Sequence, residues 1–191
     1  MRNSRKDMLR SEMKQLSHKI DLGKLKNVPL GHSSILPQML VDFAKAVDLP
    51  HINYNALRLL ARVHDIGKIM VPESILDKPG RLNQYELQVV RKHSRYGFCI
   101  AQSVPMLTPI ANWILTHHEW WNGQGYPLGL VGEEIPLESR LLSIIDAYDA
   151  MTTHRPYRPI MTKKEALAEL NRYAGIQFDP QLVEKFISFL C

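Results

Sequence analysis

The chain has 191 residues, 45% of them hydrophobic, which is enough for one domain with a sizeable core. No apolar run approaches the ~18 residues of a membrane span, and no apolar stretch follows the basic N-terminus as it would in a secretory signal. Cys99 and Cys191 lie far apart, which argues against a cysteine-based metal site and favours a reducing compartment. We therefore expect a cytoplasmic protein.

The formal net charge of +5 is unevenly distributed. Residues 1–27 hold eight Lys/Arg and three Asp/Glu, whereas residues 28–191 hold sixteen of each kind. We expect a basic linker or helical segment at 1–27 and one globular domain at 28–191. The segment could contact a membrane surface or nucleic acid, but a solvated linker is the simpler interpretation, and we expect no nucleic-acid polymer as a partner. A neutral domain that handles an anionic substrate needs local positive charge, which metal ions can supply.

Helical patterns dominate the sequence, and strand patterns are almost absent. Apolar residues recur at three- and four-residue steps in three segments: 38–47, 54–67 and 136–151. Capping signals open three further helices: Asn83 with Glu86, Thr162 with Glu165, and Asp179 before Pro180, for helices at 83–94, 163–173 and 181–190. Gly and Pro predict loops at 77–81, 122–127 and 154–159. The sequence predicts an all-α fold, a bundle of about seven to eight helices.

Histidines and carboxylates with metal-ligating chemistry are spread over these helices. The candidates are His32, His64, Asp65, His93, His117, His118 and Asp146. His64 and Asp65 end an apolar helix, which Gly67 can terminate. Neighbouring helical side chains point about 100° apart, so the pair could serve two metals about 3.5 to 4 Å apart, with the aspartate bridging them.

Adjacent histidines also end a helix at His117 and His118, just before an aromatic, glycine-rich loop. A helix end frees their directions, so both could serve one metal. Asp146 lies in a helix that is apolar on its own flank, and a carboxylate there is costly to bury unless it is paired or binds a metal. A lone histidine in a helical domain is more often an ordinary surface or core residue, so only the whole set indicates a metal site.

Four motifs together resemble the HD-GYP family of cyclic dinucleotide phosphodiesterases, a branch of the HD-domain metal-dependent phosphohydrolases. The motifs are HDIGK, RKHSRYG, HHEWWNGQGYP and DAYDAMTTHRPYR, and the similarity covers about residues 28–188. The resemblance implies an all-α fold of the HD type with a two- or three-metal centre. It also implies hydrolysis of cyclic di-GMP to linear pGpG, GMP or both.

Site residues follow from the resemblance motif by motif. One metal would be held by His32, His64, Asp65 and Asp146, and Asp65 would bridge to a second metal held by His93, His117 and His118. Asp65 and Lys68 would be catalytic, with Lys68 contacting the scissile phosphate. The residues implied for the nucleotide pocket are Gly125, Tyr126 and Pro127 of the signature loop, together with Asp149, Arg155 and Arg158.

Three departures from the family pattern refine this expectation. Asn122 stands where the family loop usually has aspartate, and HSSILPQM lacks the arginine that often follows the first histidine. Val28 occupies the position where three-metal members carry glutamate, so we expect two metals. Iron and manganese suit such a site best, and nickel, cobalt and zinc are alternatives.

The implied chemistry is attack on phosphorus by a metal-activated hydroxide, with Lys68 stabilising the charge that develops on the phosphate oxygens. Arg155 and Arg158 could hold the distant phosphate or a guanine edge, or belong to a solvated loop. Tyr126 could stack on a base or only pack the loop. Gly123 and Gly125 suit a backbone with positive φ or a close approach to a ligand, and the alternative is that they merely cap the preceding helix.

Other functions stay open at this stage. The site could act on another nucleotide, such as a different cyclic dinucleotide. The chain could also be a non-catalytic receptor, or a module that docks a GGDEF-type diguanylate cyclase domain, and a basic N-terminal helix could pair in a homodimer. The presence of all the ligands and Lys68 argues against a pure receptor, because a receptor has no need of them.

Overall fold

The computed structural model describes residues 35–48, 52–153 and 160–191, so the predicted boundary at residues 27 and 28 lies outside the described part. The all-α prediction is confirmed. Besides the four-residue helix α4 (Glu73–Leu76), this part of the chain forms eight α-helices: α2 (Leu36–Ala46), α3 (Tyr54–Val63), α5 (Gln84–Arg91), α6 (His93–Ser103), α7 (Ala111–Thr116), α8 (Leu137–Thr152), α9 (Lys163–Arg172) and α10 (Pro180–Leu190). Three short 3-10 helices join them: η2 (Ile66–Met70), η3 (Thr108–Ile110) and η4 (Gly132–Glu134).

All three predicted caps are present. The Asn83 side chain accepts a hydrogen bond from the Glu86 N–H and the Glu86 carboxylate accepts one from the Asn83 N–H, and Thr162 with Glu165 does the same. The Asp179 side chain accepts from two N–H groups at the start of α10. The helix expected at 83–94 differs, because it breaks at Lys92 and a new helix, α6, begins at His93.

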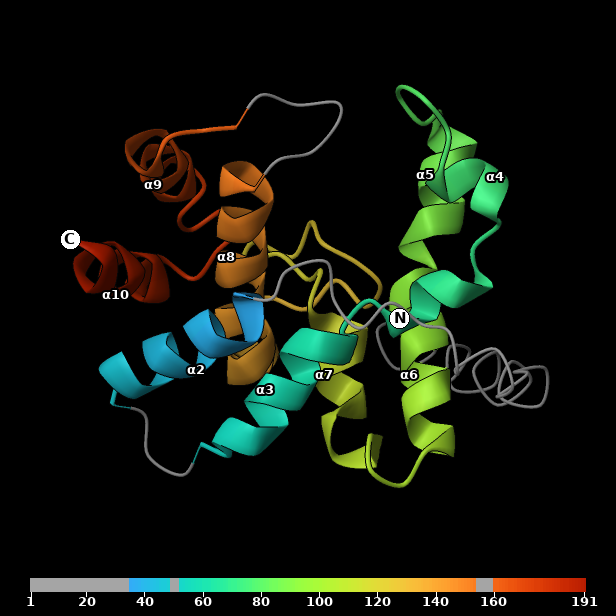
Figure 1. Cartoon of the computed structure of the whole chain (residues 1–191), viewed down its shortest axis with the longest axis horizontal. Helices are drawn as coiled ribbons and strands as arrows, with labels where there is room; N and C mark the ends of the chain where they lie inside the picture. Colours follow the sequence, from blue (N-terminus) through green and yellow to red (C-terminus); the bar gives the residue numbers. More distant parts are fainter. Residues whose placement is uncertain (1–34, 49–51, 154–159) are drawn as a thin grey trace.

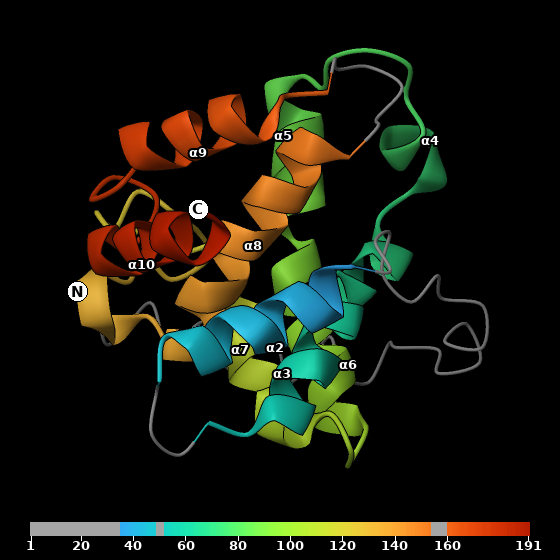
Figure 2. The same ribbon diagram turned by 60° about the vertical axis from the view of Figure 1, so that its left-hand side comes forward.

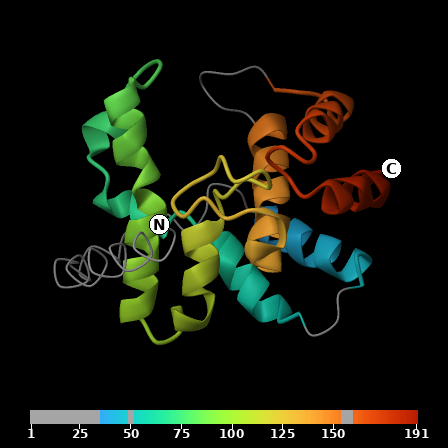
Figure 3. The same ribbon diagram turned by 180° about the vertical axis from the view of Figure 1, so that it is seen from behind.

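Helix α8 lies at the centre of the molecule, between two groups of helices (Figure 1). On one side it contacts α2, α9 and α10 (Figure 2). The Phe186 ring lies 5.0 Å from Phe43 and 5.3 Å from Tyr148, centroid to centroid, in edge-on contacts that join α2, α8 and α10. On the other side α6 packs against α7 and η2. Seen from behind, the long connection from α7 to α8 runs between the two groups (Figure 3).

Helix α3 ends at Val63, earlier than the periodicity predicted, and a turn at His64 and Asp65 leads into η2. Gly67 therefore does not terminate α3. A Cβ on Gly67 would lie 1.9 Å from the carbonyl oxygen of His93, so glycine is required for η2 to pack directly on the start of α6. This close approach places Asp65 beside His93.

None of the helices in the described residues is long and apolar enough to cross a membrane.

Candidate metal centre

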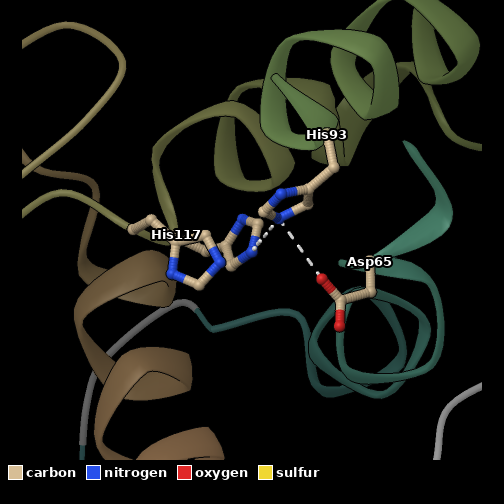
Figure 4. A group of neighbouring side chains, drawn as sticks. Asp65, His93 and His117 are labelled. Carbon is tan, nitrogen blue, oxygen red and sulfur yellow. Dashed lines mark hydrogen bonds and ion pairs between the residues drawn. The ribbon is translucent and has the colours of Figure 1, made fainter. Parts of the chain in front are cut away.

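Four predicted ligands converge at one point. Asp65, His93, His117 and His118 each offer a ligand atom, and these atoms all lie within 4.8 Å of one another. The His93 Nε2 atom is 3.3 Å from Asp65 Oδ1 and 3.4 Å from His117 Nε2. Figure 4 shows the imidazoles of His93 and His117 and the Asp65 carboxylate pointing toward one another from different elements. The fold thus joins the turn after α3, the start of α6 and the end of α7.

Two further predicted ligands extend this cluster on the other side of Asp65. His64 Nε2 lies 3.5 Å from Asp65 Oδ2 and 3.7 Å from Asp146 Oδ1. The Asp146 side chain is 32% exposed. Its place beside His64, rather than burial on an apolar flank, is therefore what associates it with the site. His32 lies outside the described residues.

Three of the imidazoles are oriented by the backbone. Their Nδ1 atoms lie close to the carbonyl oxygen three residues earlier: His64 to Ala61 at 3.0 Å, His93 to Val90 at 2.7 Å and His117 to Ile114 at 2.7 Å. A carbonyl oxygen can only accept, so each Nδ1 carries the proton and donates. The lone pair of each Nε2 is then left for the centre, which is the tautomer that a metal ligand needs.

His118 is held differently. Among the described residues the structure gives its ring no hydrogen-bonding partner. Instead the ring stacks on Tyr126, with centroids 4.9 Å apart and planes inclined at 30°. Burial raises the pKa of the Tyr126 hydroxyl, so this ring stays neutral in its contact with His118. The Arg91 guanidinium lies over the Tyr126 ring at 5.2 Å from its centroid.

The protonation states favour metal binding. Burial lowers the pKa of His93 and of His117, and lowers that of His118 to about 3, with neighbouring imidazoles adding to the effect. All three rings are therefore neutral near pH 7. Burial raises the pKa of Asp65, but electrostatic interactions with His64, the Lys68 ammonium, His117 and His93 outweigh it and hold this pKa below its usual range. An ionised carboxylate among neutral imidazoles is a donor set that suits divalent transition metals.

Lys68 lies in η2 and contacts the Asp65 carboxylate. Its Nζ atom is 2.5 Å from Asp65 Oδ2, and its side chain is 36% exposed. The ammonium group therefore combines contact with the centre and access to solvent.

The signature loop is built by close backbone contacts. Gly123 has a φ of 81°, whereas a Cβ on Gly125 would lie 2.2 Å from the Trp120 amide nitrogen. One glycine thus provides positive φ and the other a close approach, to the protein's own backbone. The Asn122 side chain accepts a hydrogen bond from the Gln124 N–H, which helps to close the turn.

Glu119 is a residue of this region that the sequence analysis missed. Its side chain is buried and accepts hydrogen bonds from the backbone N–H groups of Leu128, Gly129 and Leu130. The signal available in the sequence was an acidic residue set between the histidine pair and two tryptophans, where a charge needs a specific partner.

The other residues predicted for the nucleotide pocket do not belong to the group of four converging residues. Asp149 lies one turn after Asp146 on α8, is not part of the four-residue group, and accepts a hydrogen bond from the Thr153 hydroxyl at 3.3 Å. Arg155 and Arg158 lie outside the described residues.

Comparison with known proteins identifies the family. Residues 7–182 match the HD domain family. The chain belongs to the HD-domain family. The chain is 38% identical over 146 residues to the cyclic di-GMP phosphodiesterase response regulator RpfG of Xanthomonas campestris, covering 75% of this chain and 39% of that protein. It is 41% identical over 124 residues to 3'3'-cGAMP-specific phosphodiesterase 2 of Vibrio cholerae, covering 64% of this chain and 24% of that protein. The chain therefore spans well under half the length of these curated relatives.

The structure also resembles Bd1817, an HD-GYP-type protein from Bdellovibrio bacteriovorus, with a TM-score of 0.61 and 19% sequence identity. The similarity covers 100% of this chain and 64% of that one. At this identity the similarity supports the fold. The family match and the sequence relatives confirm the predicted resemblance to this family of phosphodiesterases. HD-domain phosphohydrolases are metal-dependent.

Proposed function

We propose that this chain hydrolyses cyclic di-GMP at a centre of divalent metal ions, giving linear pGpG, GMP or both. The observation that carries the proposal is the convergence of Asp65, His93, His117 and His118 within 4.8 Å. The choice of cyclic di-GMP as substrate is supported by the relative from Xanthomonas campestris, which is named a cyclic di-GMP phosphodiesterase.

The contacts of Asp65 support a centre of two metal ions. The two oxygens of Asp65 face different imidazoles, with Oδ1 at 3.3 Å from His93 Nε2 and Oδ2 at 3.5 Å from His64 Nε2. A bridging Asp65 would share one ion with His64, Asp146 and His32. It would share the other ion with His93, His117 and His118. Iron or manganese suits these ligands best, with nickel, cobalt or zinc as alternatives.

Bound divalent ions would supply Lewis acidity toward the phosphate and a nucleophilic water near neutral pH. The chain's own residues would do the rest. Lys68 would leave Asp65 Oδ2 and bind a phosphate oxygen where negative charge increases during the reaction. We assign Gly125, Tyr126, Asp149, Arg155 and Arg158 to the nucleotide pocket. Because Tyr126 already contacts His118 and Arg91, its part in the pocket would be to form a fixed wall.

A second candidate substrate is 3'3'-cGAMP, because the Vibrio cholerae relative is named as specific for it. This dinucleotide has the same phosphodiester linkages but replaces one guanine by adenine, so the metal centre would serve both substrates. The choice would then depend on residues that contact the bases. Docking of a GGDEF-type domain and homodimer formation are compatible with either activity, as is a cytoplasmic location.

The decisive experiment uses purified chain, stripped of metal and reconstituted with Mn²⁺ or Fe²⁺. Each preparation is incubated with cyclic di-GMP or 3'3'-cGAMP, and linear products are separated by chromatography. We expect product from cyclic di-GMP only with metal, and none from His93→Ala. Product from 3'3'-cGAMP alone would select the second candidate. The absence of product from both would overturn the proposed activity.

A further inference from the structure

Glu119 is a buried acid directly after the ligand pair. Its side chain is only 3% exposed. Its carboxylate oxygens accept three backbone N–H groups, from Leu128 at 2.5 Å, Gly129 at 3.0 Å and Leu130 at 3.1 Å. Hydrogen bonds to a carboxylate are stronger than those between neutral groups, and leaving such buried donors unpaired is costly. Residues 128–130 are therefore tied to the position that follows His118.

The same contacts confine Tyr126, which lies between Glu119 and the residues it binds. The Tyr126 N–H donates to the His118 carbonyl oxygen at 3.1 Å. Gly125, the residue before it, lies directly against the backbone of Glu119 and Trp120. Both ends of the short segment 125–130 are thus fixed to residues 118–120. The Tyr126 ring has little freedom to leave the His118 ring.

His118 needs this support more than the other imidazoles. His64, His93 and His117 each donate Nδ1–H to a backbone carbonyl, whereas the described residues give the His118 ring only ring contacts. A metal-ligating histidine is usually oriented by a hydrogen bond at its second nitrogen. In this chain the stack on Tyr126 takes that place.

We propose that Glu119 is a positioning residue for a divalent-metal ligand: its carboxylate fixes segment 125–130, and Tyr126 in that segment holds the His118 ring toward the metal. This inference rests on the proposed metal centre and goes beyond it by assigning a role to a residue that touches neither metal nor substrate. Loss of such an orienting partner typically weakens metal binding by roughly 10- to 100-fold.

The test measures Mn²⁺ binding by calorimetry on metal-free protein, without any substrate. Glu119→Gln keeps the size of the side chain but replaces one acceptor oxygen by an NH₂ group, which cannot accept a backbone N–H. We expect it to weaken Mn²⁺ binding by roughly 10-fold, and Glu119→Ala by up to about 100-fold. The matched control is Glu134→Ala, which removes an exposed glutamate of η4, in the same connection between α7 and α8, that accepts the Val131 N–H at 3.0 Å. We expect its affinity to stay at the wild-type value.

A second set of variants tests the route through Tyr126. Tyr126→Phe keeps the ring and should bind Mn²⁺ as the wild type does, whereas Tyr126→Leu should be weakened. If Glu119 acts through Tyr126, adding Glu119→Gln to Tyr126→Leu should cost little more, since the two losses share one cause. Fully additive losses would overturn this route.

Hydrogen exchange separates positioning from general destabilisation. In Glu119→Gln we expect faster exchange at the amides of Leu128, Gly129 and Leu130 and unchanged exchange in α6 and α8. Unchanged Mn²⁺ affinity despite this faster exchange would overturn the proposal, as would faster exchange throughout the protein. A wild-type chain that binds Mn²⁺ but leaves cyclic di-GMP intact would overturn the proposed activity alone. A wild-type chain that binds no Mn²⁺ would overturn both.

Discussion

The two sides of the candidate metal centre differ in burial and in charge. On one side His93 and His117 are 1% and 2% exposed, neutral near pH 7, and oriented by helix carbonyls. On the other side the side chains of Asp65, Lys68 and Asp146 are 24%, 36% and 32% exposed, and Lys68 is ion-paired to Asp65. The closed side is suited to binding cations, and the open side to meeting an anionic substrate.

This division has a physical cause. A neutral imidazole with its Nδ1–H satisfied can be buried at little cost, whereas an ionised group needs water or a partner of opposite charge. Asp65 meets that need by lying at the border, where it contacts His93 on one side and Lys68 on the other.

The largest effect is expected on the closed side. His117→Ala or His118→Ala removes one of the imidazoles that we propose as ligands of the same ion. The metal content should therefore fall from about two ions per chain to at most one. Elemental analysis after gel filtration measures this content, with Gln124→Ala, an exposed change in the following loop, as the control. A metal content that stays at the wild-type value in both histidine variants would contradict the site.

On the open side, Lys68→Ala should separate chemistry from metal binding. The variant should keep its metals, because Lys68 is not a ligand, and lose roughly 10² in turnover, because developing charge on the phosphate goes unstabilised. Lys78→Ala is a matched control. The Lys78 side chain is 35% exposed, and its Nζ atom lies 2.8 Å from Glu86 Oε1, outside the candidate centre. Comparable turnover in the two lysine variants would remove Lys68 from the reaction.

The signature loop after His118 gives the third prediction. Gly125→Val places side-chain atoms against the backbone of Glu119 and Trp120, next to His118. Because that backbone cannot move without moving His118, we expect metal affinity to fall by roughly 10-fold or more. Hydrolysis of cyclic di-GMP and of a small phosphodiester should fall with it. If the Michaelis constant for cyclic di-GMP rose alone, with metals still bound, Gly125 would instead shape only the nucleotide pocket.

The sequence predicted the helices well where a local signal marks their ends. The pairs Asn83 with Glu86 and Thr162 with Glu165 are satisfied within one turn of chain, so residues close in sequence determine them. The break at Lys92 and the early end of α3 follow from contacts between η2 and α6, which are distant in the chain. Periodicity carries no information about such contacts.

The candidate site divides in the same way. Motif resemblance named the four candidate ligands that converge, because the motifs specify residue identity and spacing. The same motifs suggested no role for Glu119, since its partners are backbone N–H groups nine to eleven residues later, and a backbone amide has no signature in the sequence. Gly67 was predicted to end a helix, because the sequence does not show that the fold packs this glycine against the His93 carbonyl oxygen.

The smallest expected effect concerns pH, and it tests the closed side without metal. Burial lowers the pKa of His118 to about 3 in the folded chain, whereas an unfolded histidine titrates near ~6.5. Between these pH values the unfolded state binds a proton that the folded state does not. The free energy of unfolding of the metal-free protein should therefore be fully retained above about pH 6.5. Below that pH it should fall by up to ~1.4 kcal/mol per pH unit for this residue.

Urea denaturation from about pH 7 to about pH 5 measures the slope. His118→Asn removes this titration, so its slope should be shallower than that of the wild type. Equal slopes in the two proteins would show that His118 is protonated in the folded chain. The buried side of the centre would then be more accessible to water than its small exposed area indicates.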